Sequence, residues 1–224
     1  YLFYNIFVRN FKHYFLLNER IAQSGEEKEI RKLLSIKKKG KFIDIGCFHP
    51  TRQNNTYELY KHGWRGINID LNSLSIKLFK FARPRDINIC TAISEKKTTK
   101  QLYFLGDLDT KNTIDSNHVN YLRKYFNVKK FEKKKIKTET INNIINKYNF
   151  SSFDFFNIDV EGHEYEIIKS FDFKKYKPKL ICIEILNHNK AAIKRNKKTI
   201  NILKKNGFNY ISTIGYNQFF LKKK

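Results

Sequence analysis

Three short apolar runs that carry or end in a carboxylate constrain the fold of this chain more than any other feature. They are FIDIG, FDFFNID and KLICIEIL, which begin at Phe42, Phe153 and Lys179. Strands buried on both faces of a sheet have continuous apolar sequences of this kind. Segments with helical periodicity lie between them. The pattern predicts an open α/β sheet with mostly parallel strands.

Strand and helix signals alternate along most of the chain. We expect strands at Lys41–Gly46, Gly66–Asp70, Asp86–Ser94, Lys100–Leu105, Lys133–Thr138, Phe153–Asp159, Lys179–Leu186, Phe208–Ile214 and Gln218–Lys222. We expect helices near Glu26–Ser35, Thr56–His62, Leu74–Phe81, His118–Phe126, Thr140–Tyr148, Glu164–Phe171 and Lys197–Asn206. No Pro/Gly/Ser-rich linker divides the 224 residues, which predicts one domain over 37–224 with an N-terminal helical appendage over 1–36.

The first segment, YLFYNIFVRNFKHYFLL, is aromatic at roughly helical spacing. It is expected to pack on the domain or on a second subunit of a homo-oligomer. Peripheral contact with a membrane surface is the alternative. No apolar run approaches the ~20 residues needed to cross a bilayer, and the three cysteines lack metal spacing. We therefore expect a cytoplasmic protein without disulfides.

The formal net charge of +24 is ordinarily typical of proteins that bind nucleic acid or anionic membranes. Here lysine, asparagine and isoleucine are enriched together along the whole chain, which is typical of nucleotide bias in an AT-rich genome. No specific nucleic-acid partner is therefore expected. An RNA-binding or RNA-modifying protein remains the alternative. The run VKKFEKKKIK is expected to be a solvated edge strand whose lysines discourage pairing.

Four carboxylates lie within or at the ends of the predicted strands: Asp44, Asp70, Asp159 and Glu184. Open α/β sheets bind ligands beyond the carboxyl ends of their strands. A dinucleotide site needs G-x-G-x-x-G after the first strand, and this chain has only Gly46 there, so an NAD-dependent oxidoreductase is a secondary hypothesis. Asp70, one strand-helix-strand unit later, suits the two hydroxyls of a ribose. S-adenosylmethionine has a ribose, a sulfonium and an ammonium, and no phosphate.

The segments FIDIGCFHPTRQNNTYELYKHGWRGINIDLN, TAIS and FFNIDVEGHEYEIIKSF resemble the FkbM family of S-adenosylmethionine-dependent methyltransferases. The resemblance extends from about Gln23 to Leu221, and IDVEGHE is its most specific part. It implies the class I methyltransferase, or Rossmann-like, fold, with a seven-stranded sheet and a reversed last strand. The segment FNYISTIGYNQFFL independently predicts an antiparallel hairpin.

The resemblance also implies cofactor contacts. Asp44, Gly46 and Cys47 correspond to the first cofactor motif, and Asp70 to the ribose acid. Leu71 and Asn72 would flank the adenosine, Ala92, Ile93 and Ser94 would meet the adenine, and Asp159 would lie beside the methionine moiety. Gln23 and Ser24 belong to a segment that would close over the amino-acid end of the cofactor. Asn55 and Thr56 either face the cofactor carboxylate or merely cap the next helix.

The hypothesis is therefore an O-methyltransferase, and the resemblance implies as its acceptor a hydroxyl of a sugar, a glycan or another secondary metabolite. A general base must lie within hydrogen-bond reach of that hydroxyl. His163 is the first candidate and His49 the second, because both follow strand ends and histidine is the side chain whose ordinary pKa lies nearest neutrality. His118 is expected on the surface.

The same edge of the sheet carries a group of oxygen ligands. Asp159 and Glu161, which are also candidate catalytic residues, form with Glu184, Asn187 and His188 a set that suits Mg²⁺. A metal-free mechanism is favoured, because Asp159 and Glu161 also have cofactor and helix-terminal roles.

Overall fold

The structure, a computed structural model, describes residues 22–36 and 39–223. The helix expected at residues 1–17, with its packing and membrane hypotheses, lies outside the described residues. The helices are α2 (Glu26–Leu34), α3 (Tyr57–Lys61), α4 (Ser73–Ala82), α5 (Ser116–Phe126), α6 (Ile141–Lys147), α7 (Glu164–Ser170) and α8 (Lys190–Lys205). The strands are β1 (Lys41–Ile45), β2 (Arg65–Asp70), β3 (Ile87–Cys90), β4 (Ala92–Ile93), β5 (Thr98–Phe104), β6 (Glu132–Glu139), β7 (Phe155–Ile158), β8 (Leu180–Glu184), β9 (Phe208–Ile214) and β10 (Asn217–Lys222). In this part of the chain, no helix has both the length and the apolar character needed to span a bilayer.

Seven strands form the main sheet in the order β3-β2-β1-β7-β8-β10-β9. The five neighbouring strands β3, β2, β1, β7 and β8 pair in parallel. β10 is antiparallel to both of its neighbours, β8 and β9. The predicted α/β fold with a reversed last strand and a C-terminal hairpin is therefore confirmed. Strand order reverses beside β1, which lies between β2 and β7, and this is where open α/β sheets bind ligands.

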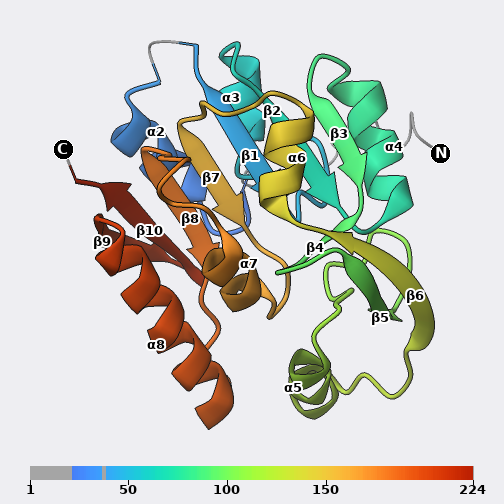
Figure 1. Cartoon of the computed structure of the whole chain (residues 1–224). Helices are drawn as coiled ribbons and strands as arrows, with labels where there is room; N and C mark the ends of the chain where they lie inside the picture. Colours follow the sequence, from blue (N-terminus) through green and yellow to red (C-terminus); the bar gives the residue numbers. More distant parts are fainter. Residues whose placement is uncertain (1–21, 37–38, 224) are drawn as a thin grey trace.

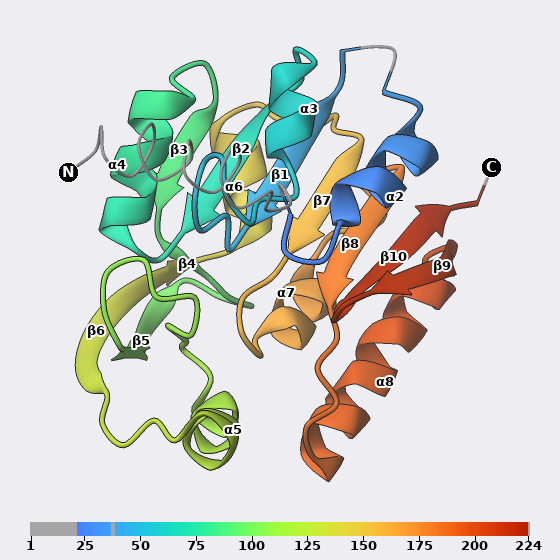
Figure 2. The ribbon, with the colours of Figure 1, turned by 180° about the vertical axis from the view of Figure 1, so that it is seen from behind.

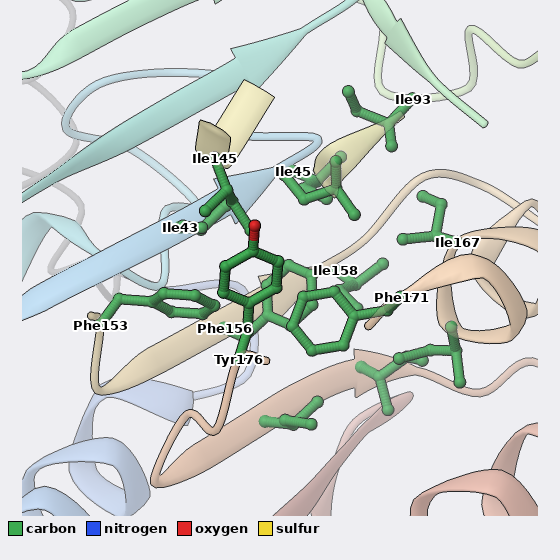
Figure 3. Close-up of a cluster of buried hydrophobic side chains, with 14 of the residues drawn as sticks. Ile43, Ile45, Ile93, Ile145, Phe153, Phe156, Ile158, Ile167, Phe171 and Tyr176 are labelled. Atoms are coloured by element: carbon green, nitrogen blue, oxygen red, sulfur yellow. The ribbon is translucent and has the colours of Figure 1, made fainter. Parts of the chain in front are cut away.

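Helices cover both faces of this sheet. α6, α7 and α8 lie on the face seen in Figure 1, and α2, α3 and α4 lie on the face seen in Figure 2. Beneath the first layer, Ile43, Ile158 and Phe156 of the strands pack against Ile145 and Ile167 of the helices (Figure 3). Each fully buried Ile or Phe side chain contributes on the order of 1.5–3 kcal/mol by leaving water.

The other helical layer closes a second core cluster. In this cluster, Ile30 of α2 and Leu59 of α3 pack with Phe42, Phe155 and Phe219 of three different strands. The described part of the predicted N-terminal appendage thus shares a core with the sheet.

A small second sheet lies at one end of the main sheet beside α5 (Figures 1 and 2). Its strand order is β4-β6-β5. The single strand expected at Asp86–Ser94 is wrong, because the chain changes sheets at Thr91. The Thr91 amide still donates to the Asp70 carbonyl at 3.0 Å, whereas Ala92 and Ile93 pair with β6. Both halves are apolar and extended, so the sequence pattern gives no sign of the change.

The second half of the lysine-rich run, Glu132–Lys137, lies in β6, and one edge of the strand is left unpaired by the described strands over these residues, as expected. β5 pairs with β6 along Glu132–Thr138, whereas β4 pairs only with Thr138 and Glu139. The side chains of Lys133, Lys135 and Lys137 are exposed.

Helix α8 starts at Lys190, seven residues before the expected start at Lys197. The Asn189 side chain accepts a hydrogen bond from the Ala192 amide at 2.8 Å and so caps the helix. The lysine-rich stretch after Asn189 concealed this start, because its exposed charges show little apolar periodicity.

Arg83, just after α4, is fully buried against the loop that follows β1. Its Nε and Nη2 atoms lie 2.9 and 2.8 Å from Oδ2 of Asp86. Its Nη1 donates to Asn54 Oδ1 at 3.2 Å and to Thr56 Oγ1 at 3.1 Å. The guanidinium also lies 4.8 Å from the centre of the Tyr60 ring. This single cation therefore joins α4 and the start of β3 to the loop after β1.

We predict that Arg83→Ala destabilises the fold by roughly 3–5 kcal/mol, because it leaves the buried Asp86 carboxylate without its cation. The exposed neighbour Arg85 provides the control, and Arg85→Ala should change stability by no more than about 0.5 kcal/mol. Urea denaturation of both variants measures the difference. Equal stabilities would show that the buried pair is not needed.

Candidate active site

A cavity of about 370 Å³ lies beyond the carboxyl ends of the parallel strands. Its floor is formed by the ends of β1, β2, β7 and β8, and its walls by α5, the loop before α5 and the β9–β10 hairpin. The residues from the strand ends include Gly46, Asp70, Asp159 and Glu184, and those from the walls include Leu108, Asn112, Tyr121, Phe126 and Tyr216.

Eight of the residues predicted to contact the cofactor line this cavity: Gln23, Gly46, Asp70, Leu71, Asn72, Ala92, Ile93 and Asp159. Six others do not line it: Ser24, Asp44, Cys47, Asn55, Thr56 and Ser94. Most of these six residues make hydrogen bonds or packing contacts within the protein. They support the residues that line the cavity.

Gly46 ends β1 in a conformation that only glycine adopts easily. Its φ is +78°, and a Cβ atom built on it would lie 1.6 Å from the carbonyl oxygen of Asp159. The Gly46 amide donates to the Ile69 carbonyl at 2.9 Å. The absence of a side chain thus lets the ends of β1, β2 and β7 converge on the cavity floor.

Asp44 is buried behind this floor and holds the following loop. Its Oδ1 accepts from Asn157 Nδ2 at 2.8 Å, and its Oδ2 accepts from Thr56 Oγ1 at 2.8 Å and Asn54 Nδ2 at 3.2 Å. Burial raises its pKa, and the hydrogen bonds from Asn157 and Thr56 and the charge of Arg83 oppose that rise. These donors fix the loop between β1 and α3, so Asp44 supports the cavity without lining it. Because the Thr56 hydroxyl donates its hydrogen bond to Asp44, it does not cap the start of α3.

The neighbouring predicted contacts have similar structural roles. Asn55 Nδ2 donates to Asn157 Oδ1 at 3.0 Å, and Cys47 packs with Ile76 and Phe79 of α4. The Ser94 hydroxyl lies 3.0 Å from Nε2 of His163.

Asp70 ends β2 and faces the cavity. Its Oδ2 accepts from the Phe48 amide at 2.8 Å and its Oδ1 from the Asn72 amide at 2.7 Å. Burial raises its pKa to about 6, against the lowering effect of these two hydrogen bonds. A carboxylate offers about four acceptor sites, so Asp70 can still accept two donors from a ligand.

Three carboxylates from the ends of β7 and β8 lie close together. Oxygen atoms of Asp159, Glu161 and Glu184 all lie within 4.8 Å of one another. Burial and then the neighbouring carboxylates raise the pKa values of Asp159 and Glu184 well above their usual range. The predicted oxygen-rich group is thus brought together, except that His188 stands apart from it and packs its ring 4.5 Å from the ring of Tyr121.

The two predicted base histidines have different surroundings. His163 lines the cavity, with Nε2 3.3 Å from Lys100 Nζ and Nδ1 3.6 Å from Glu166 Oε2. His49 is fully buried and does not line the cavity. Its Nδ1 accepts from the amides of Thr51 at 3.3 Å and Arg52 at 3.2 Å, and this fixes a turn of the loop after β1.

The expectation that His118 lies on the surface is wrong, because its side chain is only 2% exposed. α5 folds over the IDVEG segment and places Nε2 of His118 3.0 Å from Oε2 of Glu161. The periodicity of α5 held a signal for this position, since His118 shares a buried face with Val119 and Leu122.

Arg195 of α8 was also missed by sequence reasoning. Its guanidinium donates to Asp115 Oδ2 at 2.8 Å and to Glu166 Oε2 at 2.6 Å. These contacts tie α8 to the starts of α5 and α7. A lysine-rich helix gives no sequence signal for which of its cations will be paired.

The cavity is acidic although the chain as a whole is strongly basic. Its described lining carries the carboxylates of Asp70, Asp109, Asp159, Glu161 and Glu184, and it includes one lysine, Lys111. Like charges repel in a partly buried site, so such a lining favours a cationic ligand and disfavours a phosphate.

A family model described as the methyltransferase FkbM domain matches residues 44–210, which is most of the chain. The chain belongs to the FkbM methyltransferase family. It is therefore a methyltransferase, and the family match favours methyl transfer over the NAD-dependent alternative. No curated protein matches the chain in sequence.

Distant structural likenesses accompany the family match. A TehB-like SAM-dependent methyltransferase from Corynebacterium glutamicum is 12% identical, with a TM-score of 0.48 over 98% of this chain and 97% of that chain. A fibrillarin pre-rRNA processing protein from Methanococcus jannaschii is 13% identical, with a TM-score of 0.42 over 88% and 75% of the two chains. A SAM-dependent methyltransferase from Methanosarcina mazei is 14% identical, with a TM-score of 0.40 over 86% and 94%.

We predict that Gly46→Ala destabilises the fold by more than ~4 kcal/mol or prevents folding, because its Cβ would overlap the backbone of Asp159. Gly63→Ala is the matched control. Gly63 also has a positive φ, +89°, but a Cβ there would meet only Lys39 side-chain atoms at 3.7 Å. The control therefore carries the backbone strain without the overlap, at a cost of roughly 1–3 kcal/mol. Thermal and urea unfolding measure both variants, and equal losses would contradict the role of close approach.

Proposed function

We propose that this methyltransferase uses S-adenosylmethionine and transfers its methyl group to a hydroxyl oxygen of a sugar, a glycan or another secondary metabolite. The observation that carries the proposal is the acidic cavity at the ends of β1, β2, β7 and β8. The cofactor has a cationic sulfonium and ammonium, whereas the pyrophosphate of NAD would face the carboxylates of Asp70 and Asp159.

The residues of the cavity fit the parts of this cofactor. Asp70 has free acceptor sites for the two ribose hydroxyls. The apolar side chains of Leu71, Ala92 and Ile93 suit an adenine ring. Burial disfavours the charged form of Asp159, and a cationic neighbour stabilises that form. Asp159 therefore suits the ammonium end.

Bound S-adenosylmethionine would supply a methyl group on a sulfonium, which leaves as a neutral thioether. The contribution of the protein is to hold the acceptor hydroxyl in line with that methyl and to remove its proton. Of the two histidines predicted as the base, His163 lines the cavity, and so do the candidate catalytic carboxylates of Asp159 and Glu161.

The acceptor side of the cavity suits a hydroxyl-rich molecule. Phe126 and Tyr216 line it and are 51% and 58% exposed. Such rings pack against the apolar faces of sugars, while carboxylates such as Glu184 accept their hydroxyl donors. A methyl-transfer screen over glycans tests this choice, and transfer to RNA alone would favour the RNA-modifying alternative.

We predict that S-adenosylmethionine binding, measured by calorimetry, weakens as the pH falls below 6. Asp70, with a pKa of about 6, accepts the ribose hydroxyls best as a carboxylate, so its part in the affinity should fall about tenfold per pH unit below 6.

Asp70→Asn is the control for this titration. It should bind more weakly at pH 7 and lose this part of the pH dependence. The slope that remains belongs to other groups, such as Asp159. A native chain that binds NAD but gives no heat with S-adenosylmethionine would refute the cofactor assignment.

We predict that chelation leaves methyl transfer unchanged. Asp159 has the cofactor ammonium as its cation, and Glu161 has His118 beside it, so a divalent ion is not required. Turnover with the acceptor from the glycan screen is measured before and after dialysis against EDTA. Loss of turnover that Mg²⁺ restores would instead assign the Asp159, Glu161 and Glu184 group to a metal.

A further inference from the structure

We propose that Glu161 takes the proton from the acceptor hydroxyl and that His118 is the positioning residue that holds the Glu161 carboxylate toward the cavity. This inference rests on the proposed function. The geometry of three segments that meet at the IDVEG turn supports it.

The backbone of the IDVEG turn is forced into an uncommon shape. Glu161 has φ +56° and Gly162 has φ +102°. A residue with a side chain rarely adopts such a positive φ, and residues held this way cluster at functional sites. The Thr113 hydroxyl holds the turn by donating to the Glu161 carbonyl at 2.8 Å. The turn thereby fixes the backbone from which the Glu161 side chain reaches the cavity lining.

The close approach of the His118 side chain explains why residue 162 is a glycine. A Cβ atom on Gly162 would lie 2.9 Å from Cβ of His118 and 3.1 Å from its Nδ1. The glycine of the IDVEG segment therefore leaves room for an imidazole that packs directly on the turn.

Glu161 is the one polar neighbour among the described residues that accounts for the burial of the His118 imidazole. Within the described residues neither ring nitrogen makes a hydrogen bond, and the nearest carboxylate oxygen is Glu161 Oε2, 3.0 Å from Nε2. Buried polar side chains are normally hydrogen-bonded. A small rotation of either side chain converts this contact into a charge-assisted hydrogen bond from Nε2–H to the carboxylate.

Glu161 is also more accessible than His163, the first choice from the sequence. Its side chain is 23% exposed, against 5% for His163. His163 already has the Ser94 hydroxyl 3.0 Å and the Lys100 ammonium 3.3 Å from its Nε2. Glu161 thus offers a carboxylate oxygen to the cavity, while His163 is enclosed by partners.

Glu161 is further distinguished from the two carboxylates beside it. Asp159 and Glu184 lie beside Glu161, with carboxylate oxygens of the three residues within 4.8 Å of one another, and neither accepts a hydrogen bond from a described residue. His118 gives Glu161 alone an imidazole neighbour at hydrogen-bond distance.

The proposed step balances as follows. The acceptor O–H bond breaks and its proton passes to the free oxygen of the Glu161 carboxylate. The oxygen electron pair forms the new O–CH₃ bond, and the S–CH₃ bond breaks with its electrons returning to sulfur. After product release, the Glu161 proton passes to water, which restores the carboxylate.

Four variants of the full chain test the assignment: Glu161→Gln, His118→Phe, His118→Gln and, as a surface control, His62→Phe. Phe keeps the ring packing on Gly162 without a donor, and Gln keeps an N–H donor near the position of Nε2. S-adenosylmethionine affinity is measured for each by calorimetry, and initial rates use the acceptor from the glycan screen.

We expect both His118 variants and His62→Phe to bind S-adenosylmethionine with near-native affinity, and Glu161→Gln to keep measurable binding through Asp70 and Asp159. Glu161→Gln should lower kcat about 10²–10⁴-fold, the usual contribution of a general base. His118→Phe should lower kcat with little change in the KM for S-adenosylmethionine, His118→Gln should recover most of the loss, and His62→Phe should match the native chain. Near-native kcat in Glu161→Gln would overturn the role of Glu161, and equal losses in both His118 variants would overturn the positioning role.

Nitrogen NMR of histidine-labelled chain with S-adenosylhomocysteine tests the contact without an acceptor. We expect Glu161→Gln to move the His118 ring signals and His163→Gln to leave them in place. Unmoved His118 signals in Glu161→Gln would overturn the pairing. Absence of S-adenosylmethionine binding to the native chain would refute the proposed function, whereas binding combined with near-native turnover of Glu161→Gln would refute only this inference.

Discussion

The buried carboxylate of Asp44 is the interaction on which the site depends. One of its oxygens holds Asn157 of β7, and the other holds Thr56 and Asn54 of the loop after β1. Burying a charge is costly unless donors surround it, so this arrangement is stable only when all three segments are in place. Arg83 extends the network to α4. The loop that carries Gly46 is therefore fixed before any ligand arrives, and the cavity floor is preformed.

The cavity shows why net charge says little about a binding site. The chain carries +24, yet five carboxylates line the described cavity beside a single lysine. The lysines are mostly exposed, where water and salt screen them, whereas the carboxylates at the strand ends are partly buried and interact more strongly. Local burial thus decides which ligand is attracted, and here it favours a cation.

The small sheet and α5 complete the other side of the cavity. Ala92 and Ile93 of β4 lie beside the apolar part of the lining, and α5 brings Tyr121 and Phe126 over the strand ends. α5 also carries His118 onto the IDVEG turn, so the element that covers the cavity also contacts the carboxylate at its edge. The position of α5 therefore joins acceptor recognition and the chemistry at Glu161.

Sequence alone determined the mostly parallel main sheet with its C-terminal hairpin, the carboxylates within or at the ends of its strands, and the family, because continuous apolar runs and IDVEGHE are local patterns. Asp70, Asp159 and Gly46, which the sequence assigned to the cofactor, line the cavity. Three features depended on the tertiary structure: the change of sheet at Thr91, the turning inward of Asp44 and His49, and the contact of His118 with Glu161. Each depends on which distant segment packs against the residue, and a carboxylate or an imidazole has the same local sequence signal whether its partner is a ligand, a solvent molecule or a neighbouring side chain.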